Sequence, residues 1–322
     1  MRAVVRDEYG SAEVLSVEDV PIPDVPDDEV LVKVGAAGLD RGTWHLMTGL
    51  PYPMRLAGFG VRRPKERGLG MDVAGEIVAA GPGVEACAPG DLVFGVARAS
   101  FAEYTLASPR KLAPMPTNAT FAEAAAVPVS GLAALHAVRD HGRVAPGDTV
   151  LVVGASGGVG TFAVQIAVAA GARVTGVCSG EKAELVRSLG ADVIDYRTTE
   201  ITDDGRRFDV VIDIGGNRPL SLLRRALAPR GCLVIVGGEA GGRWTGGLGR
   251  QLRAVLLSPF VRQKLGTFVS RERSEDLDQL AELVEVGTVT PVVDSVVALD
   301  EVPDAMRAME AGRIRGKIVV TP

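Results

Sequence analysis

The sequence predicts an α/β protein in which a β-rich domain accompanies a doubly wound parallel sheet. The 322 residues are too many for one typical core. At Thr149–Ala170 a strand, a glycine-rich turn and a helix follow one another without interruption. Strands and helices then alternate to about residue 236. Such alternation is typical of a parallel sheet that is covered by helices on both faces.

The composition excludes several classes of protein. A formal charge of −5, with no dominant basic block, argues against a nucleic-acid partner. The densest basic stretches are residues 62–67 and the arginines between 250 and 273. No stretch approaches the roughly 20 apolar residues of a membrane span, and the start lacks the apolar core of a signal peptide. Cys87, Cys178 and Cys232 are scattered. We therefore expect a cytoplasmic, reduced protein with no membrane partner.

The first 120 residues combine short strands with glycine and proline turns. In Glu29–Val34 the residues Val30, Val32 and Val34 fall on one face. Turns such as Gly81-Pro82-Gly83 separate the strands, which predicts a compact, irregular β domain. The strands are expected at Glu29–Val34, Asp72–Ala79, Asp91–Phe94 and Phe101–Thr105.

Residues 39–70 interrupt the β domain with few periodic residues. They carry Trp44, His45, Tyr52 and Phe59. A long aperiodic loop inside a compact domain is usually functional or mobile, so we expect such a loop here. Trp44, Tyr52 and Phe59 are candidates for a pocket wall, although core or lid packing explains them equally well.

After residue 120 the pattern changes to alternating helices and strands. Pro128 separates two helices, Phe121–Val127 and Gly131–His141, and a glycine-rich loop is expected over 237–249. The last pieces do not extend the alternation and are expected to complete the first domain. Strands are expected at Thr149–Val153, Arg173–Val177, Val193–Ile194, Phe208–Ile212, Cys232–Val236, Pro291–Val297 and Lys317–Thr321. Helices are expected at Thr161–Ala170, Glu181–Leu189, Leu220–Leu227, Arg250–Leu257, Leu277–Val286 and Val302–Ala311.

The glycine-rich turn after Val153 predicts a dinucleotide site. Gly154, Gly157, Gly158 and Gly160 stand between the strand and the helix. Glycine permits the tight turn and the close approach of backbone to a pyrophosphate, because it has no Cβ atom. The helix N-terminus then offers unpaired N–H groups and a partial positive charge. The alternative is an ordinary turn of an α/β protein, and the immediate strand–turn–helix context favours the dinucleotide site.

A series of blocks resembles the medium-chain dehydrogenase/reductase superfamily along essentially the whole chain. The blocks are AAGLDRGTWHLMTG (36–49), GLGMDVAGEIVAAGPGV (68–84), PGDLVFG (89–95), FAEYTLA (101–107), AAAVPVSGLAALHAV (124–138), GASGGVG (154–160), SLGADVIDY (188–196), FDVVIDIGG (208–216) and RGKIVV (315–320). The resemblance implies a GroES-like catalytic domain, an inserted Rossmann domain and nicotinamide-dependent hydride transfer. It implies domain limits of 1–122, 123–267 and a return over 268–322.

The resemblance also assigns site residues. Ser130 lies in a segment that faces the nicotinamide in relatives, and Asp40 stands where relatives often have Asn. With Trp44, His45 and Tyr52 these residues are pocket candidates, while the catalytic residues stay unassigned. The cofactor-binding residues implied are Gly154, Ala155, Ser156, Gly157, Gly158, Val159, Ser179, Lys182, Tyr196, Ile214, Gly237, Gly238 and Lys317.

The chain departs from the zinc-dependent members of that superfamily. Those members have a metal-binding Cys where Asp40 stands and a His-Glu pair where Met71 and Asp72 stand. Methionine is a poor zinc ligand, and only Cys87 remains of the four-cysteine lobe. We therefore expect no metal, and the chain resembles the zinc-free, quinone-reductase-like branch.

The residues after the second strand of the Rossmann domain favour NADP. NAD-binding domains place an acid there to accept from the ribose 2′-OH. Here the strand ends in Cys178-Ser179-Gly180, and Lys182 is available to pair with a 2′-phosphate. In related quinone reductases a Lys and a Tyr at the positions of Lys182 and Tyr196 contact that phosphate. The alternative for Lys182 is a solvated surface lysine.

Together these features predict an NADPH-dependent reductase of quinones or α,β-unsaturated carbonyls. No acid–base pair is evident, which fits an electron-poor acceptor that takes its proton from solvent. The partner expected is a small molecule, and the resemblance implies a homodimer. Two alternatives stay open at this point: an alcohol or aldehyde dehydrogenase of the same fold, and an NADPH-binding protein with little turnover.

Overall fold

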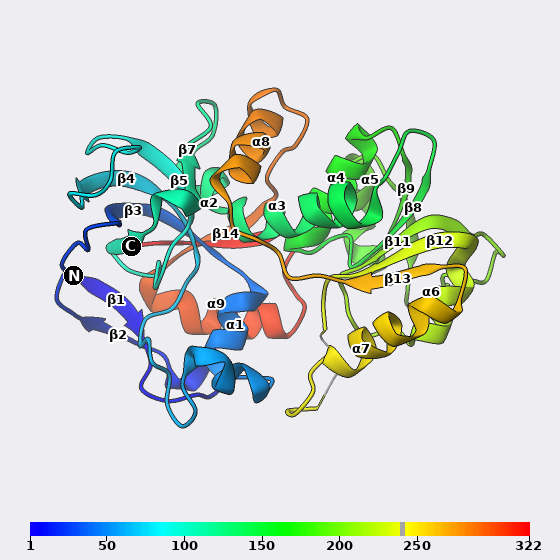
Figure 1. The fold of residues 1–322 in the computed structure, drawn as a ribbon, viewed down its shortest axis with the longest axis horizontal. Coiled ribbons are helices and arrows are strands. Elements are labelled where there is room, and N and C mark those ends of the chain that lie inside the picture. Colours follow the sequence, from blue (N-terminus) through cyan, green and yellow to red (C-terminus); the bar gives the residue numbers. More distant parts are fainter. Residues whose placement is uncertain (239–241) are drawn as a thin grey trace. The chain divides into compact units, whose positions relative to one another are not determined.

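The structure is a computed structural model that describes residues 1–238 and 242–322 (Figure 1). The described chain divides into two compact units. The first unit combines Met1–Leu132 with Arg271–Pro322, and the second is Ala133–Ser270. The domain limits expected from the sequence, 122/123 and 267/268, stay a prediction. Residues 239–241 of the expected loop 237–249 lie outside the described residues.

The first unit is built on a sheet in which the C-terminal strands join the N-terminal ones. The path of hydrogen-bonded neighbours is β14-β15-β3-β4-β5-β7, and β6 also pairs with β3. Since β15 pairs antiparallel with β3, the end of the chain completes the sheet that its first hundred residues begin. The strands are β1 (Arg2–Val5), β2 (Ser16–Asp19), β3 (Val30–Leu39), β4 (Asp72–Ala80), β5 (Leu92–Val96), β6 (Tyr104–Ala107), β7 (Leu112–Pro114), β14 (Val293–Ala298) and β15 (Lys317–Thr321).

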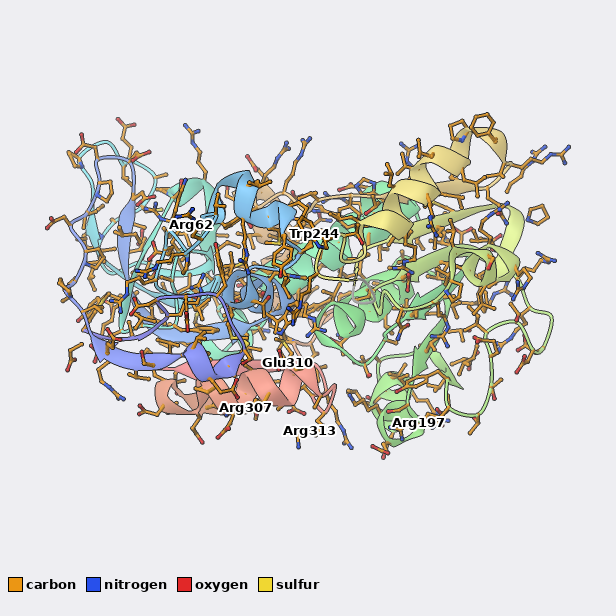
Figure 2. The ribbon with its side chains drawn as sticks, turned by 90° about the horizontal axis from the view of Figure 1, so that it is seen from below. Arg62, Arg197, Trp244, Arg307, Glu310 and Arg313 are labelled. Carbon is orange, nitrogen blue, oxygen red and sulfur yellow. The ribbon has the colours of Figure 1, made fainter. Side chains whose placement is uncertain are left out.

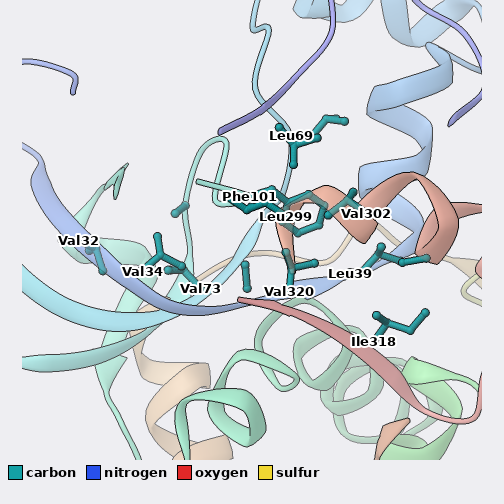
Figure 3. Close-up of a cluster of buried hydrophobic side chains, with 14 of the residues drawn as sticks. Val32, Val34, Leu39, Leu69, Val73, Phe101, Leu299, Val302, Ile318 and Val320 are labelled. Atoms are coloured by element: carbon teal, nitrogen blue, oxygen red, sulfur yellow. The ribbon is translucent and has the colours of Figure 1, made fainter. Parts of the chain in front are cut away.

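Helices and apolar side chains close the core of this unit. Figure 3 shows Val32, Val73 and Val320 on the sheet below Phe101, with Val302 projecting from helix α9. All of these side chains are buried, so the alternation of valines that predicted the strands also builds the core. The helices are α1 (Arg41–Thr48), α2 (Phe121–Ala125), α3 (Pro128–Leu135), which continues into the second unit, α8 (Ser274–Glu285) and α9 (Val302–Glu310).

The second unit is a parallel sheet in the order β10-β9-β8-β11-β12-β13. This is the Rossmann order, whose sequence of strands reverses between β8 and β11. Figure 1 shows α4 and α5 on one face and α6 and α7 on the other. The strands are β8 (Thr149–Val153), β9 (Arg173–Cys178), β10 (Asp192–Asp195), β11 (Phe208–Asp213), β12 (Leu227–Ile235) and β13 (Lys264–Thr267). The helices are α4 (Gly158–Ala169), α5 (Ala183–Ser188), α6 (Leu220–Ala226) and α7 (Leu248–Leu257), and a π-helical turn spans His136–Gly142.

Two expectations from the sequence need correction. The loop expected over 39–70 contains helix α1, which begins where the Asp40 carboxylate accepts the Thr43 amide and ends at left-handed Gly49, φ +62°. The strand expected at Phe101–Thr105 begins at Tyr104 instead, because the Phe101 carbonyl accepts the Val4 amide and belongs to a separate bridge. In both places the bounds of the element depend on capping or long-range contacts, which hydrophobic periodicity does not reveal.

Candidate functional site

The glycine-rich turn is shaped by backbone contacts that exclude a side chain at some of its glycines and not at others. Gly154 adopts φ +88°, which favours glycine, and its amide and that of Ala155 both donate to the Val177 carbonyl, each at 3.1 Å. A Cβ atom on Gly160 would lie 2.1 Å from the Gly154 carbonyl oxygen. A Cβ atom on Gly157 would meet nothing closer than 3.7 Å. Gly154 and Gly160 are therefore needed for the fold, whereas Gly157 leaves space above the turn.

The predicted cofactor residues of the second unit gather at the carboxyl ends of adjacent strands. The Ile214 amide donates to the Val153 carbonyl at 3.0 Å, next to the turn. Gly237, which follows β12, packs so closely that a Cβ atom would lie 2.0 Å from the Ile214 carbonyl oxygen. Since β8 and β11 flank the point where the strand order reverses, the turn, Ile214 and Gly237 form the edge at which doubly wound sheets bind ligands. The first amides of α4 face the same edge as an anion site.

An ion pair that the sequence did not indicate holds this edge together. Asp213 is fully buried at the end of β11, and Arg250 of α7 donates to its carboxylate. The same guanidinium donates to the carbonyls of Arg218 at 3.1 Å and Gly237 at 3.0 Å. Burial raises the pKa of Asp213, and Arg250 opposes that rise. Arg250 thus ties two loops of the site to one helix.

The residues predicted to contact a 2′-phosphate come together where β9 and β10 end. Ser179 is buried, its carbonyl accepts the Lys182 amide at 2.9 Å, and the Tyr196 amide donates to the Cys178 carbonyl at 3.1 Å. Lys182 is half-buried and Tyr196 is exposed. The structure thus brings the three predicted residues to one corner of the sheet.

Two further charges reach the same corner, Asp195 from the end of β10 and Arg197 from the segment after it. Arg197, exposed at the surface in Figure 2, pairs with Glu181 at 2.7 Å. A Cβ atom on Gly180 would lie 2.6 Å from a carboxylate oxygen of Asp195. This corner therefore holds a carboxylate, although the residues that end β9 supply none. The acid comes from the neighbouring strand, and a reading along β9 alone misses it.

In the first unit, a buried ion pair joins three segments of the chain. Asp72 of β4 accepts the Lys317 ammonium of β15 at 2.7 Å and the Val129 amide at the start of α3, also at 2.7 Å. Both side chains are almost completely buried. Burial is the largest influence on the pKa of Asp72 and raises it; Lys317 opposes the rise and the Asp40 carboxylate adds to it. Lys317, predicted to bind the cofactor, has its partner within the first unit, and its cofactor contact stays a prediction.

The pocket candidates on α1 are held by contacts within the first unit. Asp40 caps α1 through one carboxylate oxygen, while the other is buried without a hydrogen-bond partner in the described structure. The Trp44 indole donates to Glu310, and its ring packs edge-on against His45 at 5.0 Å. His45 Nδ1 lies 2.7 Å from the Leu50 carbonyl, so this nitrogen carries the proton. These contacts fix the side chains, and their part in a pocket stays a prediction.

The other candidates in this unit differ in exposure. Tyr52 stacks on the guanidinium of Arg55, which lies 4.9 Å from the ring centroid. Phe59 is exposed in a π-helical turn, and Ser130 is buried in α3, next to the Val129 amide that binds Asp72. Ser130 is thus packed inside the unit, whereas Tyr52 is half-buried beside Arg55 and Phe59 is exposed.

Comparisons with known proteins agree with this geometry. Residues 26–137 match the alcohol dehydrogenase GroES-like domain family and residues 189–320 match the zinc-binding dehydrogenase family. A chloroplastic quinone oxidoreductase of Triphysaria versicolor is 32% identical, covering 100% of this chain and 98% of the relative. A 2-methylene-furan-3-one reductase of Solanum lycopersicum is also 32% identical, over 100% of this chain and 79% of the relative. A mycobacterial protein solved in complex with NADPH superposes with a TM-score of 0.84 at 26% identity, over 100% of both chains.

The chain belongs to the medium-chain dehydrogenase/reductase superfamily, in its quinone-oxidoreductase-like branch. This confirms the family and the fold class expected from the sequence: a GroES-like domain and a Rossmann sheet.

The zinc chemistry of other superfamily members does not fit this quinone-oxidoreductase-like chain. At the positions of their ligands, Asp40 caps a helix and both Asp72 oxygens accept hydrogen bonds from Lys317 and Val129. Met71 supplies only a thioether. Within residues 1–238 and 242–322, no three His, Cys, Asp or Glu side chains form a group that could hold a metal ion.

Proposed function

We propose that this chain is an NADPH-dependent, zinc-independent oxidoreductase that delivers hydride to a quinone or an α,β-unsaturated carbonyl. The glycine turn at the edge of the Rossmann sheet carries the proposal, because its open space above Gly157 and its amides suit a dinucleotide pyrophosphate. Full-length similarity to a quinone oxidoreductase and to a 2-methylene-furan-3-one reductase supports the acceptor class.

The residues have separate tasks in this proposal. When bound, the nicotinamide supplies the hydride. The turn Gly154–Gly157 and the start of α4 bind the pyrophosphate. Ser179 and Lys182 hold the ribose phosphate, and Arg250 fixes the loops that contain Ile214 and Gly237. The proton comes from solvent. The homodimer and the cytoplasmic location expected from the sequence stay predictions.

Turnover with a panel of acceptors tests the proposal directly. We expect loss of NADPH absorbance with small quinones or enones, little turnover of simple alcohols with NADP, and no effect of a chelator. Elemental analysis should find no stoichiometric zinc. Alcohol turnover that a chelator abolishes would instead show a metal-dependent dehydrogenase. Tight NADPH binding without turnover of any acceptor would show a binding protein.

Two alanine substitutions in the turn should separate folding from cofactor binding. Gly157→Ala should lower the free energy of unfolding by no more than about 1 kcal/mol, because the methyl group meets no protein atom closer than 3.7 Å and only the poorer N-cap preference of alanine counts against it. It should weaken NADPH at least about tenfold, since the methyl group fills the space left for the pyrophosphate. Gly160→Ala should lower the free energy of unfolding by about 2–4 kcal/mol, because its methyl group meets a backbone oxygen. Urea unfolding and NADPH titration check both. Unchanged NADPH affinity in Gly157→Ala would count against the assigned site.

Two charge changes should move the cofactor preference in opposite directions. Lys182→Ala should weaken NADPH by about 1–2 kcal/mol and leave NADH nearly unchanged, since only NADPH has the 2′-phosphate. Asp195→Asn should favour NADPH by about 0.5–1 kcal/mol, because it removes a negative charge beside Gly180. Glu184→Gln, exposed on α5, is the matched control. The dissociation constants of NADPH and NADH test both predictions. If Lys182→Ala weakens the two cofactors equally, this lysine does not contact the 2′-phosphate.

A further inference from the structure

Helix α7 leaves an apolar face uncovered. The helix packs on the sheet through buried Ala254 and through Arg250, which pairs with Asp213. Leu248, Leu252 and Leu256 follow one another four residues apart on another face and are 48%, 60% and 61% exposed. Val255 is on the same face of the helix and is 45% exposed, and Phe260, in the turn that follows the helix, is 84% exposed. We call these five residues the α7 surface. Several exposed apolar residues on one helix face indicate an interaction site, whereas single exposed apolar residues do not.

The segment that carries the α7 surface is strongly basic. Residues 242–270 contain Arg243, Arg250, Arg253, Arg262 and Lys264 and no acidic residue, although the whole chain has a formal charge of −5. Arg250 is occupied by Asp213. Arg243, Arg253, Arg262 and Lys264 are exposed, and so is Trp244, labelled in Figure 2, in the turn that precedes α7. The partner of this surface must therefore offer both apolar contact and negative charge.

We propose that the α7 surface docks on an anionic lipid bilayer, with its leucines and Phe260 at the acyl boundary and its arginines among the headgroups. An interfacial helix has this composition: Leu, Phe and Trp on one side, and Lys and Arg flanking them. A second copy of the chain is disfavoured as the occupant, because a two-fold contact would bring the same basic residues against each other. The docking is peripheral, since no described helix is long and apolar enough to cross a membrane. It departs from the sequence-based expectation that the protein has no membrane partner.

Flotation of the full chain with vesicles tests this inference. It measures lipid binding and not turnover, so its result does not depend on the proposed activity. The probes are vesicles of phosphatidylcholine alone and of phosphatidylcholine with phosphatidylglycerol. We expect binding to the anionic vesicles, and at least about fivefold less to the neutral ones or after salt is raised from about 0.1 M to 1 M. Equal binding to neutral vesicles, or none to anionic ones, would overturn the proposal.

Surface variants locate the binding. Leu252→Ser with Leu256→Ser should lower anionic vesicle binding at least about tenfold, because both side chains are more than half exposed and would lose their lipid contact. Arg253→Ser with Arg262→Ser should lower it as well, and provides a second test should the leucine variant fold poorly. Leu56→Ser, an exposed leucine of the first unit, is the control and should bind like wild type. Sedimentation velocity supplies the other outcome. If the wild-type protein is a dimer that does not bind vesicles and the leucine variant is a monomer, the α7 surface joins two copies of the chain and the proposal is wrong.

Discussion

Replacing Arg250 by methionine is expected to lower the free energy of unfolding by about 3–5 kcal/mol. Asp213 is fully buried, and the guanidinium is its charge partner. Without Arg250 the carboxylate stays in the interior uncompensated, and the carbonyls of Arg218 and Gly237 each lose a donor. The loops after β11 and β12 would then be free to move, so NADPH binding should weaken even under conditions in which the variant is folded.

The effect of Arg250→Met should grow with pH. Burial already raises the pKa of Asp213 above its ordinary 3.8, and loss of Arg250 raises it further. A carboxyl group whose pKa is raised in the folded state binds a proton that the unfolded chain has released. The folded variant is therefore favoured at low pH and loses stability as pH rises from about 4 through the raised pKa. Urea unfolding at several pH values checks both sign and size.

Two control variants isolate the ion pair. Arg253→Met removes an exposed arginine from the same helix and should change the free energy of unfolding by less than about 0.5 kcal/mol. Arg250→Met with Asp213→Asn should recover part of the loss, because no unpaired charge remains buried. A cost for Arg250→Met no larger than that for Arg253→Met would contradict the role given to this pair.

Lys317→Met should be about as damaging, again by about 3–5 kcal/mol. Lys317 and Asp72 are 2% and 0% exposed, so water cannot screen the carboxylate once the ammonium is gone. The neighbouring Asp40 charge adds to the cost, since it also disfavours ionised Asp72. Lys33→Met on β3, where the lysine is exposed, is the control and should be nearly neutral. Unfolding in urea gives the comparison. An equal effect in both variants would contradict the prediction.

The double variant Lys317→Met with Asp72→Asn also tests whether Lys317 touches the cofactor. The side-chain carbonyl oxygen that Asp72→Asn retains can still accept the Val129 amide, so stability should be partly restored. If Lys317 has only a structural role, NADPH affinity returns together with stability. If Lys317 binds the cofactor, as the family resemblance implies, stability returns and the affinity does not.

The site could be predicted from the sequence where its signals are local. Gly154 and Gly160 stand where the strand passes into the helix, and their requirements are local: Gly154 has a positive φ, and a Cβ atom on Gly160 would meet the Gly154 carbonyl oxygen. The 2′-phosphate corner is also predicted from local signals, because Ser179 and Lys182 directly follow the strand β9. Asp195 was missed there because it lies on the next strand, and only the pairing of β10 with β9 brings it to Gly180.

The sequence by itself determined the alternation of strands and helices around the Rossmann turn, because hydrophobic periodicity and glycine positions depend on residues that are close in the chain. The family followed from the resemblance of sequence blocks along the chain. Only the tertiary structure decided which charges are buried together. Asp213 and Arg250 are 37 residues apart, and Asp72 and Lys317 are 245 apart. Each of these residues, read alone, resembles a solvated charge. Folding takes them out of water, and a buried charge is then stable only beside its partner.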